Sequence, residues 1–97
     1  MKSARVTVVN PSGLHARPAA LFVRTAGRFR STIRVRNSGR DDREADAKSV
    51  LAIMNLAVGR GTELELTADG DDADEAIETL RQAVEDGLGE SLDPTPR

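Results

Sequence analysis

The sequence has no cysteine, tryptophan or tyrosine, and its only histidine is His15. Without cysteine there is neither a disulfide framework nor a thiol nucleophile, and a single histidine leaves only carboxylates for a zinc site, so no metal is expected. No apolar run approaches the roughly 18 residues that a membrane span needs, and no charged segment followed by an apolar one opens the chain. We therefore expect a cytoplasmic protein without direct membrane insertion.

The chain has 97 residues, enough for one small domain and too few for a separate catalytic domain. We expect this domain to span residues 1–90 and residues 91–97, Ser-Leu-Asp-Pro-Thr-Pro-Arg, to form a disordered tail. A glycine-rich nucleotide loop of the G-x-x-x-x-G-K type is also missing, so direct use of ATP is not expected and no cofactor is predicted.

Acidic residues are missing from the first 40 positions, which hold nine Lys and Arg residues. Residues 41–97 hold all 16 acids and five bases, so the net charge of −2 divides into +9 and −11. The two halves either interleave, with charges paired across the surface, or leave a basic side for an acidic protein or a phosphate ligand. Arg24 and Arg28 are expected on the helix that His15 begins and are candidates for such a side. Nucleic acid is the weaker alternative, because no Tyr or Trp supplies a stacking platform.

The segment around His15 predicts a turn followed by a helix. Residues 10–13, Asn-Pro-Ser-Gly, are turn formers, and later apolar residues recur at the spacing of one helix face: Ala19, Phe22, Val23, Ala26 and Phe29. His15 should therefore lie at or next to the N-cap, with Pro18 in the first turn. The free N–H groups of Ala16 and Arg17 and the Arg17 guanidinium would form a cradle for phosphate. The alternative is a histidine that only caps the helix or lies on the surface.

Residues 13–20, Gly-Leu-His-Ala-Arg-Pro-Ala-Ala, resemble the active-site motif of HPr, the histidine-containing phosphocarrier of the sugar phosphotransferase system. The resemblance implies that His15 accepts a phosphoryl group on Nδ1 from phosphorylated enzyme I and passes it to IIA proteins. It also implies that Arg17 and the N–H groups of Ala16 and Arg17 stabilise this group, and that Pro18 shapes the loop. Such a protein is a monomeric carrier more than a self-contained enzyme.

A second block, residues 47–56, is similar to the other signature of this family, and Gly-Leu-Gly-Glu at 87–90 extends the resemblance over residues 1–90. The segment 48–58 is predicted to form a short helix that is apolar nearly all round. Either loops cover its outer side, or an exposed patch docks partners. By resemblance, the docking residues that contact enzyme I and IIA proteins are Val50, Leu51 and Met54.

Ser49 precedes this helix and has two interpretations. As an N-cap it would satisfy a backbone donor whatever the function. In part of the family the matching serine is phosphorylated by an ATP-dependent kinase, which would make a serine kinase/phosphorylase a regulatory partner. Two further functions stay open for the whole chain: a regulatory protein-binding module of the same fold that does not use His15, and a small basic nucleic-acid binder.

The remaining patterns predict the order β-α-β-β-α-β-α. Alternating residues indicate strands near 5–8, 33–36 and 63–66, whereas 40–43 resembles a solvated hairpin extension and 44–46 only a short, charged edge strand. The first helix should close near Gly27, and the last should begin with Asp72 and Glu75 as an acidic capping box and end at 87–89. We expect α+β class, with helices on one face of the sheet. The resemblance implies an open-faced β-sandwich with a four-stranded antiparallel sheet.

Overall fold

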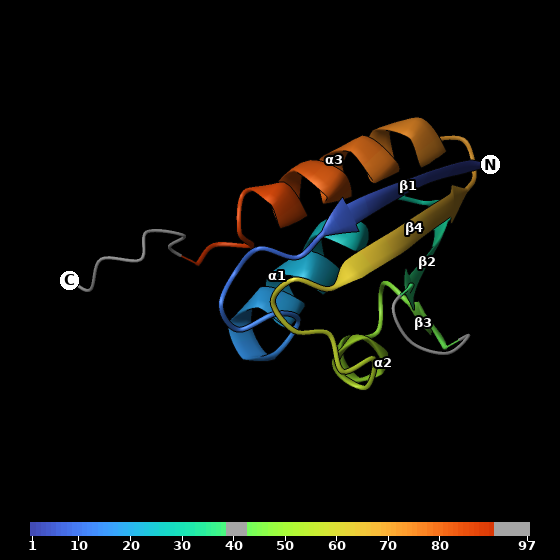
Figure 1. Ribbon diagram of the computed structural model, residues 1–97. Helices are drawn as coiled ribbons and strands as arrows, with labels where there is room; N and C mark the ends of the chain where they lie inside the picture. The colour runs from blue at the N-terminus through green and yellow to red at the C-terminus, as the bar shows by residue number, and fades with distance from the viewer. Residues whose placement is uncertain (39–42, 91–97) are drawn as a thin grey trace.

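The computed structural model describes residues 1–38 and 43–90, which form an antiparallel four-stranded sheet and three helices (Figure 1). In chain order the elements are β1 (Lys2–Thr7), α1 (Ala16–Ala26), β2 (Thr32–Asn37), β3 (Glu44–Asp46), α2 (Val50–Met54), β4 (Glu63–Asp69) and α3 (Ala73–Glu85). The strand order across the sheet is β1-β4-β2-β3. The predicted open-faced β-sandwich of α+β class, with the order β-α-β-β-α-β-α, is confirmed.

One face of the sheet is buried beneath the helices (Figure 1). Along β4, Leu64, Leu66 and Ala68 are fully buried, and the residues between them are exposed or half-buried. Because successive side chains of a strand point to opposite faces, this alternation gives the sheet one apolar side. Leu66 pairs with Val35 of β2 on one flank and with Ala4 of β1 on the other, so the pairing aligns the apolar side chains into rows.

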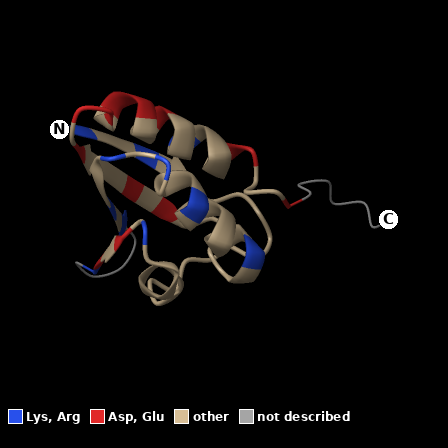
Figure 2. Ribbon diagram, turned by 180° about the vertical axis from the view of Figure 1, so that it is seen from behind, with Lys and Arg blue, Asp and Glu red and all other residues tan. Residues whose placement is uncertain are grey.

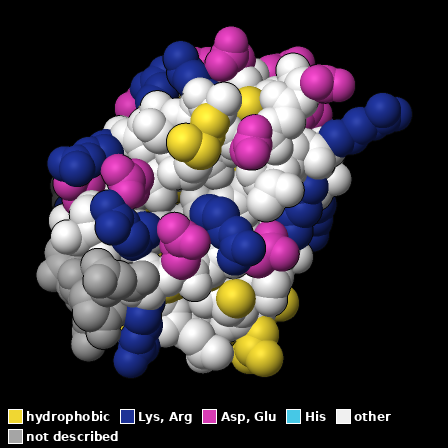
Figure 3. Space-filling view, turned by 90° about the vertical axis from the view of Figure 1, so that its right-hand side faces the viewer, with side chains coloured by type: hydrophobic (Ala, Val, Ile, Leu, Met, Phe, Trp, Pro, Cys, Tyr) yellow, Lys and Arg dark blue, Asp and Glu magenta, His cyan; other side chains and the backbone are white. Residues whose placement is uncertain are grey.

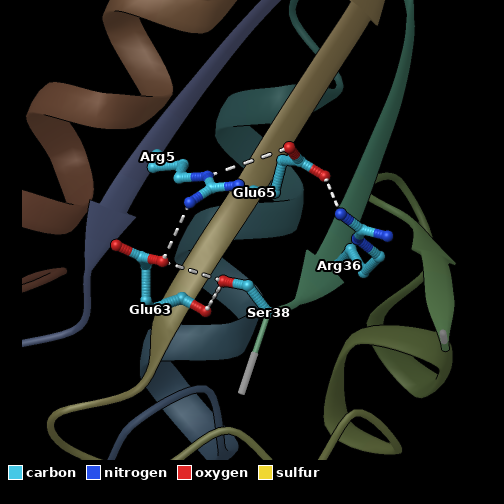
Figure 4. A network of polar contacts seen from close by, with 5 residues as sticks. All are labelled: Arg5, Arg36, Ser38, Glu63 and Glu65. Carbon is cyan, nitrogen blue, oxygen red and sulfur yellow. Dashed lines mark hydrogen bonds and ion pairs between the residues drawn. The ribbon is translucent and has the colours of Figure 1, made fainter. Parts of the chain in front are cut away.

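The other face of the sheet is polar and carries a network of paired charges (Figure 4). Arg5 lies 3.8 Å from Glu63 and 3.9 Å from Glu65, and Arg36 lies 2.5 Å from the other oxygen of Glu65. Ser38 donates to the backbone carbonyl of Glu63 at 2.8 Å. Basic residues of the first half of the chain therefore interleave here with acidic residues of the second half. The space-filling view also shows cationic and anionic side chains alternating (Figure 3).

The predicted capping box at the start of α3 is wrong. Asp72 is the N-cap, but its side chain makes no capping hydrogen bond. Its carboxylate instead accepts the N–H groups of Arg30 at 2.8 Å and Ser31 at 3.0 Å, together with the Ser31 hydroxyl. These hydrogen bonds, that of the Ser31 hydroxyl foremost, hold the pKa of Asp72 below its ordinary value. Asp72 thus joins α3 to the connection before β2.

The first helix ends near Gly27, as predicted, whereas the second is shorter than predicted. α1 ends at Ala26 with Gly27 as its C-cap, so Arg28 lies beyond the helix on which it was expected. α2 covers five residues, within the segment 48–58 that was predicted as helix. It cannot extend to residue 58, because Ala57 has a φ of 56°, in the left-handed region that an α-helix excludes.

The end of α3 and the edge strand agree with the prediction. Gly87, with a φ of 90°, donates to the carbonyl of Val84 at 3.1 Å, and Leu88 donates to that of Ala83 at 3.0 Å. This pair of bonds is the Schellman motif that ends many helices at a glycine. The short charged strand at 44–46 is β3. The hairpin extension expected at 40–43 lies outside the described residues except for Arg43, and the expected tail at 91–97 lies outside them entirely.

Candidate active site

His15 lies where the loop after β1 meets α1. Its backbone is extended, with a φ of −126° and a ψ of 155°, as is usual for an N-cap, and its carbonyl accepts the N–H of Ala19 at 3.5 Å. The side chain is exposed and makes no capping hydrogen bond. The prediction that His15 occupies the N-cap is therefore confirmed, but the interpretation of its imidazole as a capping group is wrong.

The first turn of α1 leaves donors without acceptors. Within residues 1–38 and 43–90, the backbone N–H groups of Ala16 and Arg17 donate to no acceptor, and Pro18 has no N–H to donate. Such donors at the N-terminus of an 11-residue helix, together with the helix dipole, attract anions. The Arg17 side chain is also exposed and has no ion pair within this part of the chain. The two N–H groups and the guanidinium that were expected to form the cradle are therefore unpaired within the described ranges, and the Arg17 side chain is exposed.

The loop between β1 and α1 packs on the segment that connects α2 to β4. Leu14 is fully buried, and its N–H donates to the carbonyl of Val58 at 3.1 Å. At Gly13, with a φ of 62°, a Cβ atom would lie 2.3 Å from the Val58 oxygen and 2.7 Å from the Cα of Gly59. Only glycine fits this close approach of two backbones. No motif in the sequence relates residues 58–59 to the site.

A carboxylate from the C-terminal end of the described chain also holds this loop. Oε1 of Glu90 accepts Nδ2 of Asn10 and the N–H of Ser12, both at 2.9 Å, and Oε2 accepts the Ser12 hydroxyl at 2.7 Å. These bonds, that of Asn10 foremost, hold the pKa of Glu90 below its ordinary value. Sequence analysis assigned Glu90 no role, and the only signal was its place in the Gly-Leu-Gly-Glu resemblance. Residues 78 positions apart give no local pattern that relates them.

The residues predicted to dock partners are exposed on α2. The exposed fraction is 43% for Val50, 69% for Leu51 and 36% for Met54, whereas Ile53 is fully buried. The helix therefore buries one side only, and the interpretation that loops cover its outer side is wrong. Hydrophobic side chains protrude in the space-filling view at the lower edge, where α2 lies in Figure 1 (Figure 3). Because α2 packs against α1, this patch adjoins the helix that carries His15.

The two arginines proposed for the same surface are placed differently. Arg24 is exposed on the last turn of α1, and it has no ion pair among the described residues. Arg28 lies past the helix, with its guanidinium 5.9 Å from the centre of the Phe29 ring, and borders a hollow of about 480 Å³ between α1 and α3. Figure 2 shows basic segments on α1 and acidic ones along α3. Charges are thus interleaved on the sheet, whereas the charged residues of α1 are basic and those of α3 are acidic apart from Arg81.

Ser49 is the N-cap of α2, and its hydroxyl accepts the N–H of Ala52 at 3.3 Å. The capping interpretation of this serine is therefore confirmed. The side chain is half-buried, and the exposed residues of α2 follow it directly. A change at Ser49 would thus alter both the start of α2 and the border of the hydrophobic patch.

The site offers an exposed imidazole as nucleophile and donors for an anion. No group of three or more His, Cys, Asp or Glu residues that could hold a metal ion occurs in the described ranges 1–38 and 43–90. In the same ranges no helix has the length and apolar character required to cross a membrane. An imidazole beside free N–H groups and a guanidinium has the chemistry for accepting a phosphoryl group, because that transfer depends on positioning and charge stabilisation.

Comparison with known proteins agrees with this chemistry. Residues 2–86 match the model of the family described as "PTS HPr component phosphorylation site". The phosphocarrier protein HPr of Pseudomonas aeruginosa is 41% identical over 91 residues, which cover 93% of this chain and 98% of that protein. The crystal structure of HPr-C-His from Thermoanaerobacter tengcongensis is 45% identical with a TM-score of 0.87, covering 94% of this chain and 99% of that one. The chain belongs to the HPr family, the phosphocarriers of the phosphotransferase system.

Some relatives are much longer than this chain. The multiphosphoryl transfer protein of Haemophilus influenzae is 41% identical over 90 residues, which cover 93% of this chain but only 18% of that protein. The chain thus spans less than a fifth of the length of this relative.

Proposed function

We propose that this protein carries a phosphoryl group on His15 from phosphorylated enzyme I to IIA proteins of a sugar phosphotransferase system. The observation that carries the proposal is the exposed, uncapped imidazole at the N-terminus of α1, beside backbone N–H groups of Ala16 and Arg17 that have no acceptor within the described ranges. Membership of the HPr family supports it. We also propose that it works as a monomer in the cytoplasm.

The transfer requires no group beyond those of the two proteins. The Nδ1 lone pair of neutral His15 attacks the phosphorus, and the bond between phosphorus and the donor side chain breaks as the new bond forms. The N–H groups of Ala16 and Arg17 and the Arg17 guanidinium stabilise the charge on the phosphoryl oxygens. Pro18, which is buried in the first turn, holds the loop-to-helix junction in place. Delivery to a IIA protein is the same displacement with His15 as the leaving group.

The partners would dock on α1 and α2. Leu51, with 69% of its surface exposed, and its neighbours Val50 and Met54 would form the apolar centre of this interface. Arg24 and Arg28 would form a basic rim that attracts an acidic partner over long range. A thioether side chain such as that of Met54 adapts to more than one partner surface, which suits a protein that binds both enzyme I and IIA proteins.

Ser49 is proposed as the regulatory position. A phosphate on its hydroxyl would add a charge of about −1.5 to −2 next to the hydrophobic patch, where a docking partner must exclude water. A serine kinase acting there would thereby weaken docking while leaving His15 itself unchanged, and the phosphorylase activity would restore docking by removing the phosphate.

The test of the main proposal is acid-labile phosphate on the purified protein after incubation with enzyme I and phosphoenolpyruvate. We expect the parent protein to take up phosphate and His15→Ala to take up none, with Ser49→Ala as a control that keeps the acceptor. Phosphate that persists on His15→Ala would reject His15 as the acceptor. A parent protein that takes up no phosphate would favour the regulatory module or the nucleic-acid binder.

A further inference from the structure

The loop that presents His15 is attached to the far end of the described chain through one side chain. Residues 10–13 form a turn that closes with the N–H of Gly13 donating to the carbonyl of Asn10 at 3.2 Å. Glu90 accepts hydrogen bonds from both Asn10 and Ser12 within this turn. Residues 14 and 15 then follow without any other element between the turn and the imidazole.

The chemistry of this contact suits a carboxylate. All three groups that face Glu90 are donors: the Asn10 amide nitrogen, the Ser12 N–H and the Ser12 hydroxyl. An ionised carboxylate accepts on both oxygens, whereas an amide of the same size could keep the two bonds to Oε1 but not accept the Ser12 hydroxyl on the other atom, and it would lose the charge that strengthens all three bonds. Asn10 is fully buried and also donates to the carbonyl of Gly13 at 2.9 Å, so its amide connects Glu90 to the far end of the turn.

Glu90 is itself held in place by the residues before it. Leu88 is almost completely buried, and its N–H completes the motif that ends α3. Gly87 and Gly89 have φ values of 90° and 82°, a conformation in which glycine is free of strain. The carboxylate is therefore presented to the turn from an anchored position on the core.

We infer that Glu90 is a positioning residue for phosphoryl transfer: its carboxylate holds residues 10–13 in the conformation that presents the His15 imidazole. This inference rests on the proposed function. Glu90 touches neither the imidazole nor the free N–H groups of α1 in the described chain, so it acts through the turn. A displacement of a reacting group by about 1 Å can lower a rate about 100-fold, and a turn that has lost these bonds samples such displacements.

The substitution Glu90→Gln tests this inference, with Glu85→Gln as the matched control. Glu85 is an exposed carboxylate on α3 that pairs with Arg81, so the control removes the same charge at a similar place without touching the turn. We expect Glu90→Gln to lower the kcat of transfer from phosphorylated enzyme I by about 10-fold or more while KM stays near the parent value. KM should not change because the hydrophobic patch on α2 is intact. The control should transfer at the parent rate.

A second measurement needs no partner protein. The Ser12 amide hydrogen should exchange with solvent faster in Glu90→Ala than in the parent, because the oxygen that accepts it is removed. Ser12→Ala, which removes only the hydroxyl bond, should give a smaller loss of kcat and little change in exchange. If Glu90→Gln fails to fold, the kcat of Ser12→Ala still tests whether the hydrogen bonds between Glu90 and the turn support transfer.

Parent-level kcat in both Glu90→Gln and Glu90→Ala would overturn the inference. An equal loss in Glu85→Gln would overturn it too, because the effect would then come from charge alone. A rise in KM without a fall in kcat would assign Glu90 to docking instead. If the parent protein accepts no phosphate, the proposed function fails, and unchanged Ser12 exchange in Glu90→Ala then separately rejects the positioning role.

Discussion

Replacing Ser49 by Ala or by Asp separates its contribution to stability from its contribution to docking. Ala removes the hydroxyl that accepts the N–H of Ala52, whereas Asp is an equally good N-cap. Loss of an N-cap costs about 0.5–2 kcal/mol, and the 3.3 Å bond to a helix of only five residues places Ser49 near the lower end, at about 0.5–1 kcal/mol. For a domain of this size, that corresponds to a fall in Tm of about 2–8 °C for Ser49→Ala. Ser49→Asp should keep the parent Tm.

Transfer activity should change in the opposite order. Ser49 is half-buried beside Val50 and Leu51, so a carboxylate at this position loses water when a partner covers the patch. An acidic partner would repel it as well. A penalty of about 1.4 kcal/mol lowers affinity tenfold. We expect kcat/KM to fall about tenfold or more in Ser49→Asp. Ser49→Ala adds no charge and should transfer at the parent rate.

Two assays on the parent, Ser49→Ala and Ser49→Asp distinguish the role of Ser49 in capping from its role in docking. Thermal unfolding followed by circular dichroism gives the Tm values, and the rate of phosphate uptake from phosphorylated enzyme I gives kcat/KM. Equal rates for Asp, Ala and parent would rule out negative charge at this position as a switch for that step. A Ser49→Ala protein with the Tm of the parent would show that the cap contributes nothing to α2.

Four further results are expected. Arg17→Lys keeps the charge but loses the planar fork, so transfer should fall with a near-parent Tm; full activity would mean that a point charge suffices. Reversing the charge at Arg24 or Arg28 should slow association with enzyme I, and the effect should shrink as salt rises; equal rates at low salt would reject a basic docking rim. Gly13→Ala should destabilise the fold strongly in thermal unfolding, because its Cβ would lie 2.3 Å from a backbone oxygen; a parent-like Tm would contradict this geometry. Asp72 has a lowered pKa, so its stabilisation is complete above its ordinary pKa and is lost as pH falls below it; Tm should therefore drop more between pH 7 and pH 3 in the parent than in Asp72→Asn.

The parts of the fold that were predictable depend on local periodicity. Alternation at Ile33 and Val35 and at Leu64 and Leu66 located two strands and their buried face, because one apolar side is enough to fix which way each residue points. The position of His15 at the N-cap followed from turn formers on one side and a helical repeat on the other. Both signals lie within a few residues of what they predict.

The parts that were missed depend on contacts between distant segments. Asp72 was expected to cap its own helix, but its partner is Ser31, 41 residues away. Arg28 was placed on α1 because Phe29 continues the helical spacing, yet Phe29 is buried in the connection that follows the helix. Glu90 contacts the loop at Ser12 across nearly the whole chain. Periodicity contains no information about such partners, so only the folded chain reveals them.

The place of β4 in the middle of the sheet governs when the sheet can form during synthesis. Among the residues that the structure describes, β1 pairs only with β4, and the segment between them takes roughly 3–11 s to emerge at about 5–20 residues per second. During that interval β1 is an unpaired strand on a nascent chain, the kind of edge that associates with other chains. Every charged residue among the first 40 is basic, so neighbouring nascent chains carry the same sign and repel one another. We therefore expect the uneven charge of the sequence to protect the waiting strand until its partner is made.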